Sequence, residues 1–139
     1  MSLQSTGSNG GGLAKRRVIV TGSACGLGAA FVEVLAQEGA QVVIGGDVLH
    51  AEDQALADRL GANMHFEKLD FADPADIDSL VQKAAQKIGG IDSLINNAAI
   101  TNSGGWLAGE LSIETWDAVM NVNVRGHMAH EYRGAALSA

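Results

Sequence analysis

Three glycines in the segment TGSACGLG, residues 21–28, are spaced so that a backbone turn could hold an anion. The segment RRVIV before it predicts a buried strand, and a run of helix formers follows it. A helix that begins in such a turn presents unpaired N–H groups and a partial positive charge, which suits a diphosphate. The residues of the turn that we expect to contact such a ligand are Gly22, Ser23, Cys25, Gly26, Leu27 and Gly28.

Each glycine of this turn has a separate expected role. Gly22 lets the chain turn sharply, Gly26 lets the backbone approach the anion, and Gly28 lets the helix pack closely on the sheet. The spacing G-x-x-x-G-x-G differs from the commoner G-x-G-x-x-G, and an isolated match would equally fit an ordinary tight turn. Its place between a strand and a helix favours nucleotide binding. Cys25 is interpreted as an inert spacer, with a thiol acidified at the helix N-terminus as the alternative.

Asp47 follows the next apolar run, QVVIGGD, about 20 residues beyond the turn. An acid at the end of a second strand can accept hydrogen bonds from both hydroxyls of an adenosine ribose. A carboxylate there would repel the additional phosphate of NADP, so NAD is the expected cofactor and NADP the less favoured one. The alternative is that Asp47 is a solvated turn residue or the cap of the next helix.

Hydrophobic periodicity predicts strands that alternate with helices. Strands are expected at 16–20, 41–47, 63–70 and 91–96, and helices at 26–37, about 51–60, 74–88 and from 113 into the 120s or 130s. Asp73 and Pro74 are the expected N-cap and first residue of the third helix. The pattern indicates an α/β fold: a Rossmann-like, doubly wound parallel sheet, truncated after about four strands. Residues 1–12 are expected to form a flexible leader, and 13–139 an NAD-binding Rossmann half-domain.

Two helices carry apolar stripes that we expect to face the core. The stripe of the first helix consists of Leu27, Phe31, Val34 and Leu35. The stripe of the last helix consists of Trp116, Val119, Met120 and Asn123, and so includes one side-chain amide. A buried amide without partners is costly, so Asn123 is expected to have a catalytic task or a structural bond.

The composition excludes several classes of protein. The net charge is −7 and no basic run occurs, which argues against a nucleic-acid partner and against an anionic membrane surface. Cys25 is the only cysteine, so no internal disulfide can form, and a cytoplasmic location is expected. The pair His127 and His130 lacks the H-E-x-x-H order and a third ligand, so no metal site is predicted.

Four motifs together resemble the N-terminal half of the short-chain dehydrogenase/reductase family: TGSACGLG, LDFAD (69–73), NNAA (96–99) and NVNVRG (121–126). The resemblance runs from about Leu13 to near the C-terminus. It implies an NAD-dependent oxidoreductase that acts on an alcohol or ketone as its small-molecule substrate. It also implies that Asn123 is a catalytic residue that helps to hold a water, and that the cofactor is contacted by Asp70, Phe71, Asn97, Ala98 and Ala99.

The match to this family is incomplete in two respects. Its catalytic serine and its Tyr-x-x-x-Lys motif are not found, because the only tyrosine, Tyr132, is followed four residues later by Ala136. We therefore expect the chain by itself to be inactive. Gly45 and Gly46 look like a one-residue insertion that could swing Asp47 away from the ribose.

A second hypothesis stays open beside the enzyme. The chain could be a nucleotide-binding or oligomerisation module without catalysis, and a homo-oligomer is expected in either case because an unpaired sheet edge invites pairing. A methyltransferase is disfavoured by the spacing of the glycine turn and by NNAA. For Asn123, a structural bond between the last helix and the fourth strand is as good an interpretation as the water-holding role.

Overall fold

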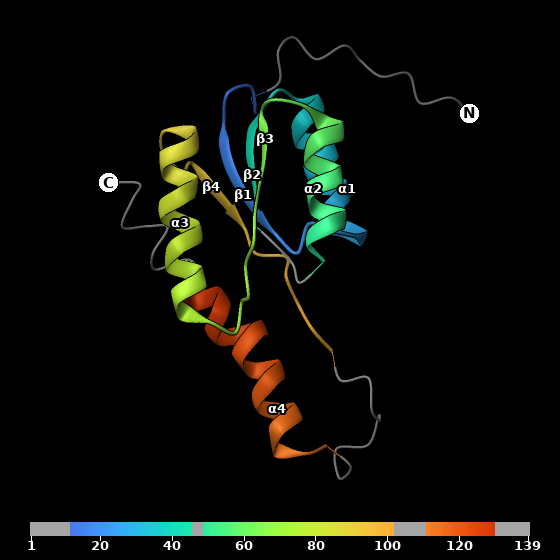
Figure 1. Ribbon diagram of the computed structural model, residues 1–139, viewed down its shortest axis with the longest axis vertical. Helices are drawn as coiled ribbons and strands as arrows, with labels where there is room; N and C mark the ends of the chain where they lie inside the picture. The colour runs from blue at the N-terminus through green and yellow to red at the C-terminus, as the bar shows by residue number, and fades with distance from the viewer. Residues whose placement is uncertain (1–11, 46–48, 102–110, 130–139) are drawn as a thin grey trace, which may run out of the picture.

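The computed structural model describes residues 12–45, 49–101 and 111–129, so all but one residue of the expected leader lies outside it. Strands and helices alternate along the chain, as the periodicity predicts (Figure 1). The elements are β1 (Arg17–Thr21), α1 (Gly26–Gln37), β2 (Gln41–Gly45), α2 (His50–Leu60), β3 (Met64–Glu67), α3 (Pro74–Ile88), β4 (Ser93–Ile95), α4 (Ile113–Met120) and a π-helical turn (Asn121–Gly126).

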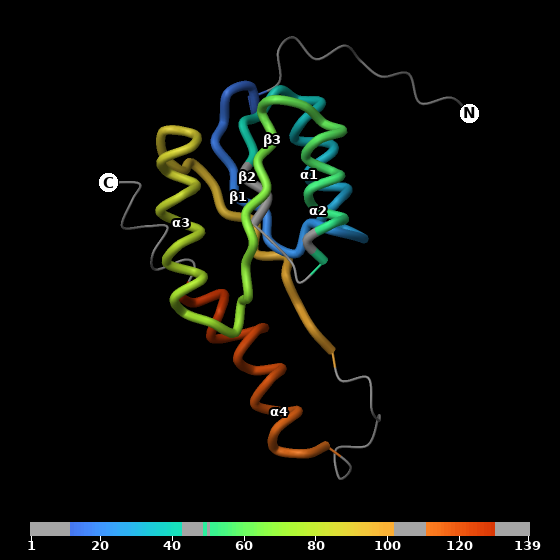
Figure 2. Tube along the Cα trace, viewed as in Figure 1, coloured from blue at the N-terminus to red at the C-terminus, as the bar shows by residue number. Residues whose placement is uncertain are grey.

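The four strands form one parallel sheet in the order β3-β2-β1-β4. The chain therefore returns across β1 to place β4 on its far side, and the strand order reverses between β1 and β4. Helices α1 and α2 cover one face of the sheet and α3 covers the other, as the trace in Figure 2 shows. The expected Rossmann-like, doubly wound architecture is confirmed. In such a sheet, ligands bind beyond the carboxyl ends of the strands where the order reverses.

Alternate residues of β1 build two separate cores. Val18 and Val20 pack with the helices α1 and α2, whereas Ile19 packs with α3 on the opposite face. This alternation follows from the two-residue period of side chains along a strand. Both faces of β1 are buried, which is why residues 18–20 form an unbroken apolar run rather than an alternating one.

Helix α3 matches its sequence prediction closely. The Asp73 side chain accepts a hydrogen bond from the Ala75 backbone N–H (2.8 Å), and Pro74 occupies the first helical position. Gly89 ends the helix in the left-handed conformation, with φ 76°. The expected apolar stripe is buried at every position, namely Ile77, Leu80, Val81, Ala84 and Ile88.

The predicted buried stripe of α1 is wrong for most of its members. Leu35 is buried as predicted, but Leu27, Phe31 and Val34 are 71, 40 and 54% exposed. The helix buries Gly28 and Val32 beside Leu35. Both sets follow helical spacing, so periodicity could not choose between them. The face of α1 that carries Gly28 is buried because Gly28 lies directly against the backbone of the preceding turn.

The predicted stripe of the last helix is also incorrect. Trp116 is 51% exposed, and α4 buries none of its residues. Figure 1 gives the reason: α4 extends beyond the carboxyl edge of the sheet, where no described strand lies beneath it. Its N-terminus follows expectation, because the Ser112 hydroxyl accepts a hydrogen bond from the Thr115 backbone N–H (3.1 Å).

An ion pair joins the starts of β1 and β4. The Arg17 guanidinium donates to both carboxylate oxygens of Asp92 (3.0 and 2.6 Å) and to the Gly89 carbonyl (2.6 Å). These side-chain bonds, together with a bond from the Arg17 backbone N–H (2.9 Å), hold the pKa of Asp92 well below its ordinary value. A depressed folded-state pKa adds stability above the unfolded-state pKa of about 3.9, and that stability is lost as the pH falls toward the folded-state value.

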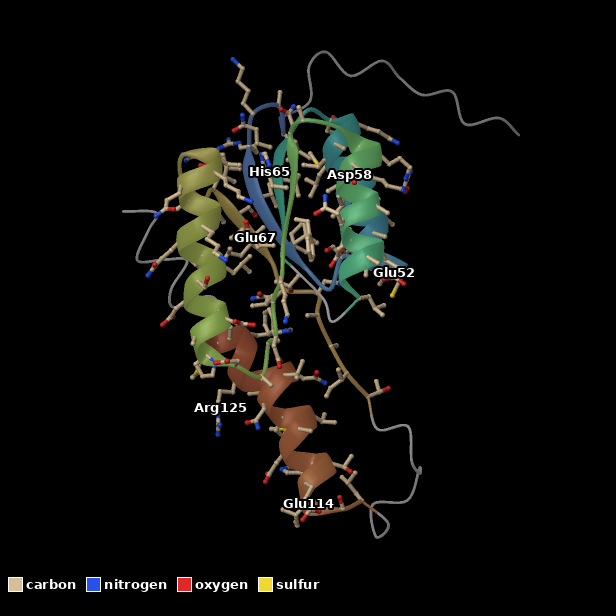
Figure 3. All side chains as sticks on the ribbon, in the orientation of Figure 1. Glu52, Asp58, His65, Glu67, Glu114 and Arg125 are labelled. Atoms are coloured by element: carbon tan, nitrogen blue, oxygen red, sulfur yellow. The ribbon has the colours of Figure 1, made fainter. Side chains whose placement is uncertain are left out.

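We therefore expect Asp92→Asn to lower the free energy of unfolding at pH 7, and to lower it by less once the pH falls below the unfolded-state pKa of about 3.9. Urea denaturation of both proteins at pH 7 and at about pH 3 measures the difference, which should shrink as the acid end is approached. Asp58→Asn, which removes an exposed acid of α2 labelled in Figure 3, is the control and should change little. An equal effect of Asp92→Asn at both pH values would contradict the prediction.

Candidate functional site

The three glycines of the 21–28 turn have different surroundings. Gly22 and Gly26 have positive φ angles of 65° and 56°, which favour glycine. A Cβ on Gly22 would lie 2.7 Å from Cα of Ala98, and a Cβ on Gly28 would collide with the carbonyl oxygen of Gly22. A Cβ on Gly26 would meet nothing within 4 Å. The turn is therefore packed tightly below Gly22 and Gly28 and is open above Gly26.

Helix α1 begins in this open part of the turn. Cys25 is its N-cap residue, with extended backbone angles and no side-chain capping bond, and the first helical turn carries no acidic residue. The partial positive charge of the helix N-terminus is consequently not offset by a side chain of its own first turn. An anion placed above Gly26 would face the first N–H groups of α1.

Two side chains connect the segment after β4 to the glycine turn by hydrogen bonds. The buried Thr21 hydroxyl accepts hydrogen bonds from the backbone N–H groups of Asn97 and Ala98 (3.1 Å each). The Asn97 amide in turn donates to the carbonyls of Thr21 (3.0 Å) and Gly22 (2.9 Å). The donor end of the Asn97 amide is thus bonded to the turn, and it holds Ala98 and Ala99 beside it.

A cavity of about 230 Å³ opens beside this junction. Its lining comes from the glycine turn, from the segment after β3, from the segment after β4 and from the π-helical turn: Gly22, Cys25, Leu69, Asp70, Phe71, Asn97, Ala98, Ala99, Ile100 and Val122. The structure therefore brings together seven of the expected cofactor residues, namely Gly22, Cys25, Asp70, Phe71, Asn97, Ala98 and Ala99. Figure 1 shows these segments meeting at the carboxyl edge of the sheet.

Five of the expected site residues that the structure describes do not line the cavity. Gly26, Leu27 and Gly28 belong to the start of α1 beside it, Ser23 is fully buried, and Asn123 bonds to the backbone near it. Asp47 lies outside the described residues, as do Tyr132 and His130. Within the described part of the chain, no group of three His, Cys, Asp or Glu residues could hold a metal ion.

Asn123 has a clear structural bond. Its Oδ1 accepts from the Ile100 backbone N–H (2.9 Å), and its Nδ2 donates to the Ile100 carbonyl (2.8 Å). The amide thereby joins the π-helical turn to the segment that follows β4. This is the structural interpretation of Asn123, and the water-holding role stays a prediction.

Three residues that sequence reasoning did not assign to the site also shape it. Leu69 and Val122 line the cavity as apolar walls. His127 Nε2 lies 2.6 Å from the Ala98 carbonyl, so this nitrogen carries the proton, and the ring meets Phe71 edge-on at 5.1 Å. His127 thus connects the helical residues after the π-helical turn to the cavity wall.

Asp70 is held at the cavity by a local turn. One of its carboxylate oxygens accepts from the Ala72 N–H (2.8 Å), and its own N–H donates to Asp76 Oδ2 (3.0 Å). Phe71 is buried, and a Cβ on Gly126 would lie 2.7 Å from its carbonyl oxygen. A glycine is therefore needed where the π-helical turn crosses this segment.

The sequence and the fold both match known proteins. Residues 16–133 match the family model of the short chain dehydrogenases. The chain is 40% identical over 111 residues to a 3-oxoacyl-[acyl-carrier-protein] reductase of Thermotoga maritima, covering 78% of this chain and 44% of that protein. It is 34% identical over 116 residues to a 3-alpha-(or 20-beta)-hydroxysteroid dehydrogenase of Mycobacterium tuberculosis, covering 84% and 44%. The chain thus spans about half the length of the curated relatives it matches.

Solved structures of short-chain dehydrogenases and reductases have the same fold as this chain. A short chain dehydrogenase from Burkholderia cenocepacia in complex with NADP superposes with a TM-score of 0.84 at 33% identity, covering 90% of this chain and 51% of that one. A 3-ketoacyl-(acyl-carrier-protein) reductase from Brucella melitensis complexed with NADH gives a TM-score of 0.83 at 30% identity, covering 87% and 49%. From the family match, the parallel sheet and its glycine turn, the chain belongs to the short-chain dehydrogenase family.

Proposed function

We propose that this chain forms the nicotinamide-dinucleotide-binding half of an oxidoreductase that acts on an alcohol or ketone. The observation that carries the proposal is the open space above Gly26, at the N-terminus of α1 and beside the 230 Å³ cavity. Backbone N–H groups at a helix N-terminus form a ready site for a diphosphate. The proposal takes residues 13–139 as the cofactor half-domain.

The residues present fit such a cofactor. The start of α1 would hold the diphosphate, Asp70 and Phe71 would flank the adenine, and Ala98, Ala99 and Ile100 would line the nicotinamide end. When bound, the nicotinamide supplies the hydride acceptor or donor. The protein's own part is to orient it: Thr21 and Asn97 keep the end of β4 against the glycine turn, and Asn123 keeps Ile100 in place.

We propose NAD rather than NADP as the cofactor. Similar solved structures are described with NADP, with NADH and with NADPH, so the similarity alone does not distinguish between NAD and NADP. The described lining of the cavity contains one charged residue, Asp70, and no lysine or arginine. An additional phosphate is normally met by a cation, so this lining suits NAD better. The predicted ribose contact of Asp47 points the same way.

A fluorescence titration of the purified chain tests both proposals. We expect saturable enhancement of nicotinamide fluorescence by NADH, with an affinity at least about tenfold higher than for NADPH, which corresponds to one unfavourable charge contact. Equal affinities would refute the cofactor preference alone. The absence of saturable binding of either nucleotide would refute the proposed function.

The chain alone is proposed to bind without turnover, because its only tyrosine, Tyr132, is followed four residues later by Ala136 and not by a lysine. Reduction of a ketone by NADH above the blank, catalysed by this chain, would refute that.

We also propose self-association, since α4 exposes Ile113 (71%) and Trp116 (51%) and the following turns expose Val124 (52%) and Met128 (66%). A monomer by analytical ultracentrifugation would refute it.

A further inference from the structure

A hydrogen bond from His127 reaches the backbone of the cavity wall. Because a carbonyl oxygen can only accept, His127 Nε2 donates to the Ala98 carbonyl, over 2.6 Å. The Ala98 N–H donates to the Thr21 hydroxyl (3.1 Å), so side chains bond both polar backbone groups of this lining residue. Gly22 lies directly against it, since a Cβ there would come within 2.7 Å of the Ala98 Cα. Ala98 is therefore held by the first strand, by the glycine turn and, from the opposite end of the sequence, by His127.

The imidazole ring of His127 also contacts a second wall of the same cavity. It meets the ring of Phe71 edge-on, with 5.1 Å between the ring centroids, which is a favourable arrangement for two aromatic rings. Phe71 lines the cavity from the segment after β3, whereas Ala98 lines it from the segment after β4. One side chain thus connects two walls that are distant in the sequence.

The π-helical turn explains how His127 reaches these walls. Val122 lines the cavity, and His127 follows it by five residues, directly after the turn Asn121–Gly126. In a regular α-helix, residues three or four apart share a face and residues five apart do not. Hydrogen bonds of a π-helix join residues five apart, so the wider turn lets Val122 and His127 approach the cavity together.

We propose that His127 is a positioning residue that fixes the distance between Phe71 and the wall formed by Ala98, Ala99 and Ile100. This inference rests on the function proposed above, in which Phe71 flanks the adenine and the other three residues line the nicotinamide end. His127 is not among the lining residues of the cavity, so it acts through Ala98 and not by touching the cofactor. A dinucleotide that contacts both walls needs this spacing, whereas a ligand without the nicotinamide half depends on it much less.

Two substitutions separate the hydrogen bond from the ring. His127→Phe keeps a ring beside Phe71 and removes the donor, whereas His127→Gln keeps an N–H donor and removes the ring. We expect His127→Phe to raise the Kd for NADH about tenfold, the scale of one hydrogen bond whose acceptor is left unpaired. The Kd for ADP, which lacks the nicotinamide half, should rise less than about threefold. His127→Gln should keep the Kd for NADH within about threefold of that of the unmodified chain.

The control makes the same change at a histidine away from the cavity. His65 lies on β3, is labelled in Figure 3 and is not among the lining residues, so His65→Phe should leave both Kd values unchanged. Calorimetry measures both ligands, and circular dichroism shows that each variant is folded. If His127→Phe does not fold, His127→Leu, which also lacks a donor and is smaller, takes its place.

Three results in a folded variant would overturn the positioning role alone. They are unchanged NADH affinity without the donor, equal weakening of NADH and ADP, and a His127→Gln protein that binds NADH as weakly as His127→Phe. An unmodified chain that does not bind NADH would overturn the proposed function together with this inference.

Discussion

Gly28→Ala is expected to lower the free energy of unfolding by about 3 kcal/mol or more, as overpacking against rigid atoms does. The added methyl group would collide with the Gly22 carbonyl oxygen and lie 2.7 Å from Nδ2 of Asn97. The Gly22 carbonyl is backbone, so the clash cannot be relieved by a change of rotamer. Urea denaturation followed by circular dichroism measures the loss.

Gly26→Ala is the matched comparison within the same turn. Its Cβ would meet nothing within 4 Å, but its φ of 56° is strained for alanine. We expect a loss of about 1–2 kcal/mol, which is the cost of the left-handed conformation alone. A Gly28→Ala protein as stable as Gly26→Ala would show that the close approach between α1 and the turn is not present.

Thr21→Val is expected to destabilise the fold by about 2–4 kcal/mol, because two donors lose their acceptor. The shape of the side chain is kept, but the backbone N–H groups of Asn97 and Ala98 both lose the hydroxyl that they share. Thr21 is 0% exposed, so water cannot take its place without opening the structure. The variant should also weaken NADH binding, since the cavity wall at Ala98 loses an anchor.

Thr21→Ser distinguishes the hydroxyl from the packing. It keeps the acceptor and removes a buried methyl group, which costs about 1 kcal/mol. Denaturation midpoints of the two variants should therefore differ clearly, with serine the more stable. A valine variant that matched or exceeded the serine variant would show that the threonine serves only to fill space.

The sequence could predict the parts of the fold whose cause is local. Helix α3 has a cap, a proline and one apolar face, so its bounds and its buried side followed from neighbouring residues. Helix α1 has apolar residues on two adjoining faces, and only the contact of Gly28 with Gly22 decides which one is buried. Periodicity therefore predicts Leu27 on the buried side, whereas the structure exposes it.

The same distinction applies to the site. The glycine turn and Asp70 lie in short motifs, so their residues could be named in advance. The bonds of Ser23 to Asp53 and of His127 to Ala98 join positions 30 and 29 residues apart. Such contacts depend on how α2 and the helical residues after the π-helical turn are placed, and no spacing within the sequence gives that placement. Asn123 could be singled out, but its partner Ile100 could not.

The π-helical turn at Asn121–Gly126 shifts the phase of the last helix. Each of its hydrogen bonds encloses one residue more than an α-helical bond, so side chains after the turn are rotated relative to those before it. Val122 reaches the cavity and Gly126 meets Phe71, while Trp116 stays exposed on the other side of the phase change. Removing one residue from this turn would bring the helix back into step and carry Asn123 away from Ile100.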